Sequence, residues 1–350
     1  MRARLAVSLA VALIAAPPAA HAGFPGANGR LVVSVDTCEF NPHLRAIAFT
    51  GESLGPLTRP CEVLGVDEDE EDVIRSAQAP EFTPDGQRLL FQQGGVDPAG
   101  FYTMAADGSD HQPVPGGGNG DQPSLSPDGR RIAFMRDRAV WTMALDGSDQ
   151  RRLRSRAPCP KGRGNCVHLD EPRWSPDGRY IAIRADQWAY GPGKPPWPRP
   201  GLWLIDPETG KYVRRVVAGD RAGRAPFEPD WSPDGRRLVY RTAFEQQEIK
   251  GGASGGNIFV VDRTGRNRRR VVHRKRLAEA HPVWSPDGRY IAWIGLSFGS
   301  GDVGFDVRST LMRMALRGGS PKRVRPLPGP YVEESYYHLP ELAWQPLPSG

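Results

Sequence analysis

One short phrase recurs five times along this chain and constrains its fold more than any other feature. It reads Pro, any residue, a large apolar residue, Ser or Thr, then Pro-Asp-Gly. Each copy is followed by a short apolar segment, a second apolar segment with a Gly turn, and a basic stretch. Such internal repetition indicates a chain built from copies of one supersecondary unit. The copies occupy residues 80–86, 123–129, 172–178, 229–235 and 282–288.

The recurring Pro-Asp-Gly sequence predicts a tight turn. Proline presets φ, aspartate can accept a hydrogen bond from the backbone two residues on, and glycine tolerates a positive φ. The phrase should therefore connect two strands of a hairpin, and the second turn of each unit brings the total to four short strands. The large apolar residues of the phrase are expected to pack between neighbouring sheets. They are Phe82, Leu125, Trp174, Trp231 and Trp284.

A sixth unit is divided between the two ends of the sequence. Residues 28–34 and 44–53 match the later parts of a unit, and residues 342–346 supply its missing first part. Joining the two ends closes a ring, whereas a solenoid would need polar caps instead. We therefore predict an all-β fold, a six-bladed β-propeller of four-stranded antiparallel blades closed by pairing of the N- and C-terminal strands.

The repeated Trp-Ser-Pro-Asp-Gly-Arg sequence resembles the propeller repeats of the TolB type, which are distant relatives of WD repeats. The resemblance covers residues 23–350 and implies a single propeller domain. Similar repeats also lie beneath hydrolase domains of the prolyl oligopeptidase type, so the resemblance is specific for a fold and not for an activity. The resemblance to TolB-type repeats implies that the protein acts in the periplasm together with a protein partner.

The first residues predict export. Arg2 and Arg4 precede an apolar run, and residues 20–22, Ala-His-Ala, match a signal-peptidase site. We predict that residues 1–22 are a removed signal peptide, and that the mature protein is a secreted, periplasmic or envelope monomer. The formal net charge is +6. This modest value does not predict a nucleic-acid partner, which would require a concentrated basic face. No later run reaches the roughly 18 apolar residues of a transmembrane helix.

Four cysteines in an exported chain predict two disulfides. The pairs that close the shortest loops are Cys38 with Cys61 and Cys159 with Cys166, although the sequence leaves the connectivity open. Neither pair has the short gap usual for a zinc site.

Long irregular insertions are expected on the face opposite the short turns, and such loops commonly carry binding sites. In one of them Trp188, Tyr190 and Trp197, with flanking prolines, predict a stiff aromatic surface for a protein, peptide or glycan. The alternative is an aromatic lid packed on its own blade. The insertions span residues 155–170, 185–200, 242–256, 295–309 and 325–339.

Polar residues just before the repeated prolines should gather at the mouth of the central channel. They could hold a polar ligand or a divalent metal, or they could simply line a solvated channel. The candidate ligand-binding residues are Asp170, Glu171, Glu228, His281 and His338. Three further residues of the expected channel mouth are Gln78, Asp121 and Gln122.

Two charge clusters stand out. The acidic run at residues 67–72 is typical of a solvated loop, since it lacks the spacing of an EF-hand calcium site. Lys and Arg at the end of each unit would protect an outer edge strand from pairing with other chains. The basic stretch at residues 263–276 exceeds that need, and it is expected to contact an anionic polymer of the envelope.

The sequence favours a binding protein over an enzyme. Gly-x-Ser-x-Gly matches at residues 51–55 and 295–299 lack the strand, turn and helix of a nucleophile elbow. The leading hypothesis is a non-catalytic scaffold without a cofactor. The alternative is a metal-dependent lyase-type enzyme, because some oligogalacturonate lyases resemble this repeat. Its metal ligands would be His168, His281 and His338. A structural envelope protein without a specific ligand is a third possibility.

Overall fold

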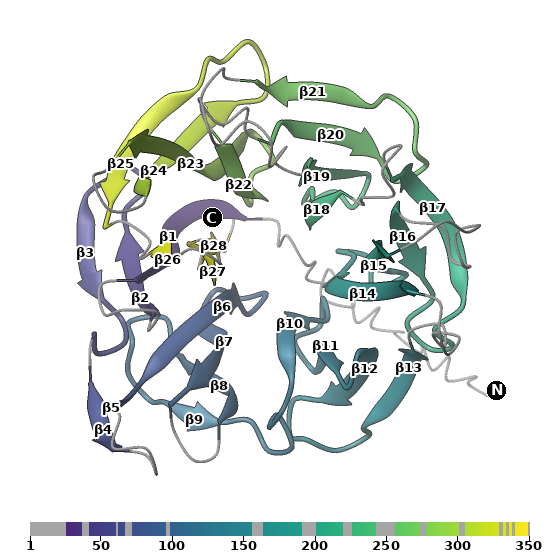
Figure 1. The fold of residues 1–350 in the computed structure, drawn as a ribbon, viewed down its shortest axis with the longest axis horizontal. Helices are drawn as coiled ribbons and strands as arrows, with labels where there is room; N and C mark the ends of the chain where they lie inside the picture. The colour runs from purple at the N-terminus through teal and green to yellow at the C-terminus, as the bar shows by residue number, and fades with distance from the viewer. Residues whose placement is uncertain are drawn as a thin grey trace, which may run out of the picture.

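The described residues of the computed structural model form six blades around a central axis (Figure 1). Each blade is an antiparallel sheet of four strands, so the predicted six-bladed propeller is confirmed. None of the described segments forms a helix that could span a membrane. The structure describes residues 26–36, 42–60, 62–66, 72–95, 99–155, 164–190, 201–219, 226–242, 256–273, 278–300, 305–328, 332–333, 336–337 and 340–348.

In every blade the chain runs from the axis outwards. From blade 1 to blade 6, the innermost strands are β28 (Leu342–Leu347), β6 (Ser76–Phe82), β10 (Asp121–Leu125), β14 (Gly164–Trp174), β18 (Phe227–Trp231) and β22 (Ala278–Trp284). The second strands are β1 (Ala27–Asp36), β7 (Arg88–Gly94), β11 (Arg131–Arg136), β15 (Ile181–Tyr190), β19 (Arg237–Arg241) and β23 (Tyr290–Ser300). The third strands are β2 (Pro42–Ile47), β8 (Gly100–Ala105), β12 (Ala139–Ala144), β16 (Gly201–Ile205), β20 (Ile258–Asp262) and β24 (Phe305–Ala315). The outermost strands are β3 (Ser53–Pro56), β9 (Gln112–Pro113), β13 (Arg151–Ser155), β17 (Tyr212–Ala218), β21 (Arg269–Val272) and β25 (Lys322–Leu327).

Two short hairpins lie in the links between blades. The first pairs β4 (Val63–Val66) with β5 (Asp72–Ile74), and the acidic run falls between these strands, largely outside the described residues. The second pairs β26 (Val332–Glu333) with β27 (Tyr336–Tyr337) before the closing strand.

The ring closes through blade 1, as predicted. Strand β28 pairs antiparallel with β1, and Trp344 lies opposite Leu31. Asn28 then ties this blade to the last one, because its Nδ2 donates to Oδ2 of Asp287 at 2.9 Å. The C-terminal strand therefore occupies the innermost position of the sheet that the N-terminal strands complete.

The repeated turn is held by its serine as well as by its aspartate. In blade 4 the Oγ of Ser175 donates to Oδ1 of Asp177 at 2.7 Å and accepts the N–H of Tyr180 at 2.9 Å. Oδ1 of Asp177 also accepts the N–H of Arg179, which is the bond predicted for this aspartate. Gly178 has φ of 68°, a conformation that a side chain would strain. The Ser or Thr therefore recurs because one hydroxyl joins both sides of the hairpin.

The hydrophobic core lies between blades, and the predicted packing residues occupy it. Trp231, for example, is 1% exposed and packs in a cluster that combines apolar residues of blades 4 and 5. Trp344 takes the equivalent place in the split blade. Burying an aromatic side chain of this size contributes about 3 kcal/mol. The blades are consequently held to one another by the residues that the repeat places at each seam.

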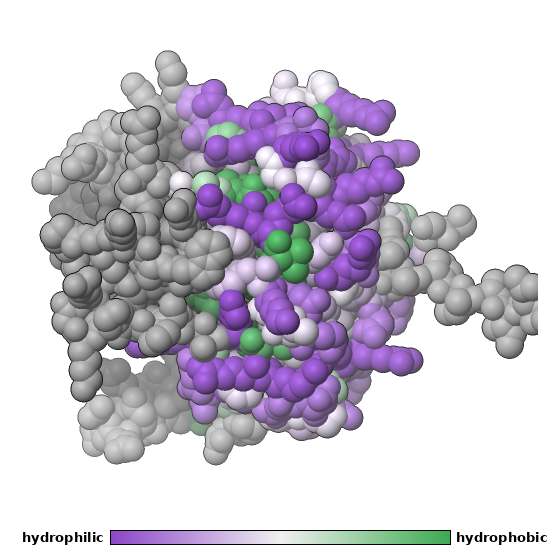
Figure 2. Space-filling model, turned by 90° about the vertical axis from the view of Figure 1, so that its right-hand side faces the viewer, coloured by the Kyte–Doolittle hydropathy of each residue, from purple (hydrophilic) through white to green (hydrophobic). Residues whose placement is uncertain are grey.

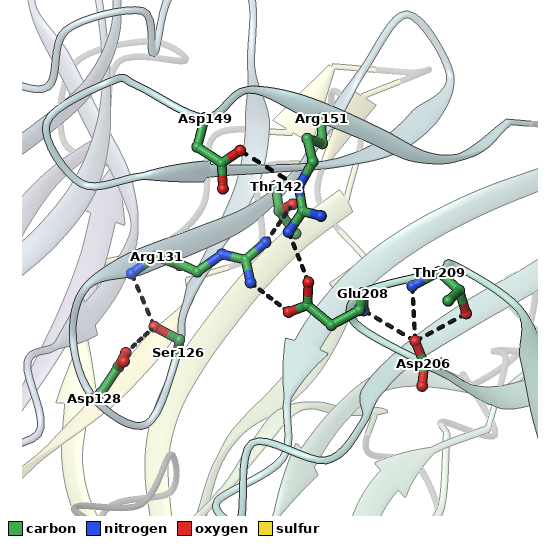
Figure 3. A network of polar contacts seen from close by, with 9 residues as sticks. All are labelled: Ser126, Asp128, Arg131, Thr142, Asp149, Arg151, Asp206, Glu208 and Thr209. Atoms are coloured by element: carbon green, nitrogen blue, oxygen red, sulfur yellow. Dashed lines mark hydrogen bonds and ion pairs between the residues drawn. The ribbon is translucent and has the colours of Figure 1, made fainter.

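Polar contacts on the outer part of the ring join blades 3 and 4 (Figure 3). Glu208, in the turn between β16 and β17, accepts hydrogen bonds from Arg131 at 2.7 Å and Arg151 at 2.8 Å. Asp206 orders the same turn by accepting the N–H groups of Glu208 and Thr209. Hydrogen bonds from Arg151 and Arg131 lower the pKa of Glu208 from its ordinary value.

The prediction of irregular loops was wrong for parts of the insertions. Strands β14 and β15 continue beyond the four-stranded part of the blade as a two-stranded hairpin, in which Val167 lies opposite Gln187. Strands β23 and β24 do the same, with Ser297 opposite Arg308. An antiparallel pair can satisfy its backbone groups simply by lengthening the ladder, so inserted residues extend strands here. The second Gly-x-Ser-x-Gly match, at residues 295–299, therefore lies inside β23.

Candidate functional site

All six blades line one cavity of about 410 Å³ at the centre of the ring. The innermost strands that surround it are visible in Figure 1. Its volume falls within the range of small-ligand and peptide pockets. Its polar lining residues are Ser34, Asp36, Gln78, Gln92, Asp121, Gln122, Asp170, Glu228, Arg241, His281 and Glu341.

The residue before each repeated proline has an unusual backbone conformation. Glu171, Glu228 and His281 have φ of 56°, 51° and 46°, in the left-handed region that side chains disfavour. Ala79 and Gln122 share this conformation. At each of these positions the pairing of the innermost strand with the second strand shifts register. The bulge turns the N–H of the residue away from its own ladder.

These N–H groups bind the neighbouring blade. The N–H of Glu171 donates to Oε1 of Gln122 at 2.8 Å, and that of Glu228 donates to Oε2 of Glu171 at 2.6 Å. The N–H of His281 donates to Oε2 of Glu228 at 2.6 Å, and Ala79 donates in the same way to Glu341. Side chains at equivalent positions thus link consecutive blades around the axis. This role explains why the strained conformation recurs.

Glu228 is the most strongly compensated carboxylate of the channel. Arg241 donates to both of its oxygens, at 2.7 Å from Nε and 2.8 Å from Nη2, and Nε2 of His281 lies 3.3 Å from Oε1. Burial by itself would raise the pKa of Glu228, but Arg241 and His281 outweigh burial and lower it to about 2. Glu228 is therefore ionised at neutral pH, and its carboxylate oxygens are already bonded to Arg241 and His281 of the same chain.

Glu171 lies in the opposite electrostatic situation. Burial raises its pKa to about 7, and repulsion by Glu228 and Asp170 adds to this effect against the attraction of Arg184. Arg184 is itself engaged with Asp170, at 3.2 Å. Glu171 therefore exchanges a proton near neutral pH. Neither the residue type nor the position of Glu171 in the repeat would predict this behaviour.

A second tier of charged residues lies next to this ring, around a smaller cavity of about 90 Å³. Glu81, Arg173 and Asp230 line it. Burial raises the pKa of Glu81 to about 7 and that of Asp230 to about 6, although Arg173 opposes both shifts. The guanidinium of Arg173 thus attracts the carboxylates of both Glu81 and Asp230. Acidic groups are therefore in excess in this part of the channel.

The structure brings part of the predicted site together. Asp170, Glu228 and His281 line the same cavity, whereas Glu171 supports the backbone of the next blade. His338 lies outside the described residues, and the side chain of His168 is not among those described. In the part of the chain that the structure describes, no group of three His, Cys, Asp or Glu side chains could hold a metal ion. The proposed metal ligands therefore remain a prediction.

Other predictions also fall outside the described part of the chain. Trp188 and Tyr190 belong to β15, but their side chains are not described, and Trp197 lies outside. Cys38, Cys61 and Cys159 lie outside as well, and the side chain of Cys166 is not described. The aromatic partner surface and both disulfides stay predictions.

Sequence reasoning missed five polar residues of the cavity, which are Ser34, Asp36, Gln92, Arg241 and Glu341. Glu341 occupies the position equivalent to His281 in the split repeat, but no proline follows it. Counting back from the aligned Trp344 would have found it. Arg241 ends an apolar strand segment and lies across the sheet from Phe227. Only the paired strands show that its side chain reaches Glu228.

Known structures support the fold. No protein-family model matches this sequence. TolB from Acinetobacter baumannii is similar with a TM-score of 0.59 at 15% identity, over 91% of this chain and 67% of the other. A protein assigned as TolB from Agrobacterium tumefaciens is similar with a TM-score of 0.55 at 17% identity, over 86% of this chain and 90% of the other. The chain has the TolB-type propeller fold.

The TolB-like propeller predicted from the repeat is thus confirmed at the level of the fold. A third similar structure is an oligogalacturonate lyase in complex with manganese, with a TM-score of 0.49 at 15% identity, over 87% of this chain and 75% of the other. Propellers support many unrelated functions, so the function of this TolB-like chain has to be argued from its own residues.

Proposed function

We propose that this protein is an exported, non-catalytic binding scaffold that takes a segment of a protein partner into the mouth of its central channel. The observation that carries the proposal is the cavity of about 410 Å³ lined by all six blades. A rigid closed ring presents such a cavity without rearrangement, so little ordering entropy opposes binding. Export rests on the predicted signal peptide, and the TolB-like fold is compatible with it.

The charges of the cavity favour a basic segment. Asp36, Asp121, Asp170 and Glu341 line it together with the Glu228–Arg241 pair. A lysine or arginine of the partner would therefore be attracted to an acidic mouth.

The chemistry of the described residues favours binding over catalysis. Glu228 and His281 contact each other, but Glu228 is held ionised by the guanidinium of Arg241. Its lowered pKa removes the proton that a general acid would need, and it makes the carboxylate a weak base. The contacts between Glu228 and His281 are therefore suited to linking two neighbouring blades around the channel.

The test is capture of partners from an envelope extract by the purified protein, identified by mass spectrometry, followed by measurement of Kd for the captured protein. The mouth variant Asp121→Asn/Asp170→Asn keeps hydrogen-bonding groups and removes two charges. We expect its affinity to fall about tenfold. The control variant Glu52→Gln/Asp149→Asn removes two exposed charges on other loops and should bind as the unmodified protein does.

Two results would overturn the proposal. Equal affinity of the mouth variant and the unmodified protein would exclude the channel mouth as the docking surface. Release of unsaturated products from acidic oligosaccharides by the purified protein with added manganese would establish the enzyme alternative instead.

A further inference from the structure

Exposed arginines gather on the outer rim of blades 4, 5 and 6, away from the channel. The outermost strands β17, β21 and β25 form this part of the circumference (Figure 1). The rim over β17 is largely hydrophilic (Figure 2). We name this surface the basic arc, and it consists of Arg214, Arg266, Arg269, Arg270, Arg317 and Arg323.

Contacts between blades make the arc continuous. A Cβ added at Gly265, in the outer turn of blade 5, would lie 2.8 Å from the carbonyl oxygen of Val216 on β17. Arg266 therefore lies beside the strand that carries Arg214. Leu316, in the corresponding turn of blade 6, packs against the cluster that contains Val272 of β21. Each turn rests on the previous blade, and the arginines of three blades follow one another along the rim.

Few carboxylates lie near the arginines of the arc, and those described are not paired with them. Asp262 in blade 5 accepts a hydrogen bond from Asn267 at 2.6 Å. Glu208 in the outer turn of blade 4 is paired with Arg131 and Arg151, and exposed Glu52 belongs to the blade 1 turn that lies against Val324 of β25. None of the six arc side chains forms an ion pair or hydrogen bond with another described residue. Arg268, by contrast, donates to the hydroxyl of Tyr240 and lies over Phe259. The six guanidinium groups consequently present their donors to solvent.

Protection of edge strands does not account for this distribution. The outermost strands of blades 1 and 2, β3 (Ser-Leu-Gly-Pro) and β9 (Gln-Pro), carry no Lys or Arg. These two strands are short and end in proline, and both features also hinder pairing of an edge strand with another chain. The outermost strand of blade 3, β13, also carries arginines, and two of these are engaged, Arg151 with Glu208 and Arg154 over the ring of Tyr212. The arginines of β17, β21, β25 and the turns before them add a positive field along the rim of blades 4 to 6.

We infer that the basic arc binds a linear anionic polysaccharide that bears carboxylate, sulfate or phosphate groups. The forked guanidinium group matches such oxyanions with two parallel hydrogen bonds. The arc follows the convex circumference of the ring, which a flexible chain can track and a flat membrane meets only locally. Among the described residues no large exposed aromatic side chain is present on which nucleic-acid bases could stack. The inference is independent of the function proposed for the channel.

The test uses fluorescently labelled dextran sulfate, with unmodified dextran of the same chain length as the neutral control. The arc variant Arg266→Gln/Arg269→Gln/Arg270→Gln removes three charges from the centre of the arc. We expect binding of dextran sulfate at low ionic strength, steep weakening with added salt, and a rise of Kd of about tenfold in the arc variant. The mouth variant Asp121→Asn/Asp170→Asn should leave this Kd unchanged.

The matched control is Arg59→Gln/Arg130→Gln/Arg138→Gln, which removes three exposed charges outside the arc. Its Kd for dextran sulfate should change less than about threefold. Equal weakening in both triple variants would reduce the effect to net charge and overturn the inference, as would absence of binding. Tighter binding to phosphatidylglycerol vesicles or duplex DNA than to dextran sulfate would overturn it too, by assigning the arc to another class of partner.

Discussion

The carboxylates of the channel differ in protonation because each one meets a different set of charges. Glu228 has Arg241 and His281 against it, whereas Glu171 has Glu228 and Asp170 nearby. At short range and out of bulk water such differences are worth more than the ordinary difference between residue types. Position around the axis thus decides which acid is charged.

The raised pKa of Glu171 predicts a specific pH dependence. Its pKa is about 7 in the folded state against an ordinary glutamate value of 4.5, so the folded state holds a proton that the unfolded state releases. This contribution to stability is present below about pH 4.5 and is lost as the pH rises towards 7. In Glu171→Gln, urea unfolding should show a smaller loss of stability between those limits, because glutamine does not titrate. Its amide oxygen can still accept the N–H of Glu228, so the link between blades is kept.

Glu208 provides the control of opposite sign. Hydrogen bonds from Arg151 and Arg131 lower its pKa, so its contribution is lost as the pH falls. Glu208→Gln should flatten the acid side of the profile slightly, since its side chain is 59% exposed and solvent screens the pairs. A profile unchanged by Glu171→Gln would contradict the raised pKa.

At the scale of the element, the hairpin turn is the unit that the chain repeats. Its serine hydroxyl and aspartate carboxylate satisfy polar groups that no neighbouring strand can reach. The turn is therefore complete within one blade, and it can be repeated without reference to the rest of the ring. The bulge at the innermost strand is different, because its N–H needs an acceptor from the next blade.

Removing the hydroxyl of the turn should destabilise the protein measurably. Ser175→Ala leaves the N–H of Tyr180 without its acceptor, and we expect a loss of about 1 to 3 kcal/mol in the free energy of unfolding. In Ser148→Ala the lost hydroxyl only donates to exposed Asp146, and the loss should stay below about 0.5 kcal/mol. Equal losses in urea titrations of the two variants would contradict the double role of Ser175.

At the scale of the whole molecule, closure through β28 is what makes the ring one unit. This strand supplies Trp344 to the seam between blades, and the residue just before it, Glu341, belongs to the ring of hydrogen bonds at the mouth. The inner edge of β1 would be unpaired without it. Stability of the ring is therefore expected to be cooperative across all six blades.

Truncation tests the closure directly. Removing residues 340–350 deletes β28 and should yield aggregates or oligomers, since an open strand edge pairs with other chains. Size-exclusion chromatography with light scattering would detect them. Removing only residues 348–350 keeps every residue of β28 and should leave a monomer with unchanged unfolding. A monomeric, cooperatively unfolding product of the longer truncation would refute the role of closure.

The repeat was enough to predict the turns, the number of blades, the packing residues at the seams and the pairing of the two ends. These features depend on local chemistry at regular positions: Ser175, Asp177 and Gly178 need only one another. The folded ring was needed to show that Glu341 and Arg241 join Glu228 at the mouth, that Glu171 titrates near neutral pH, and that the basic arc is continuous. Those properties arise from charges of separate strands and blades brought close together, and electrostatic energy depends on that distance and on burial.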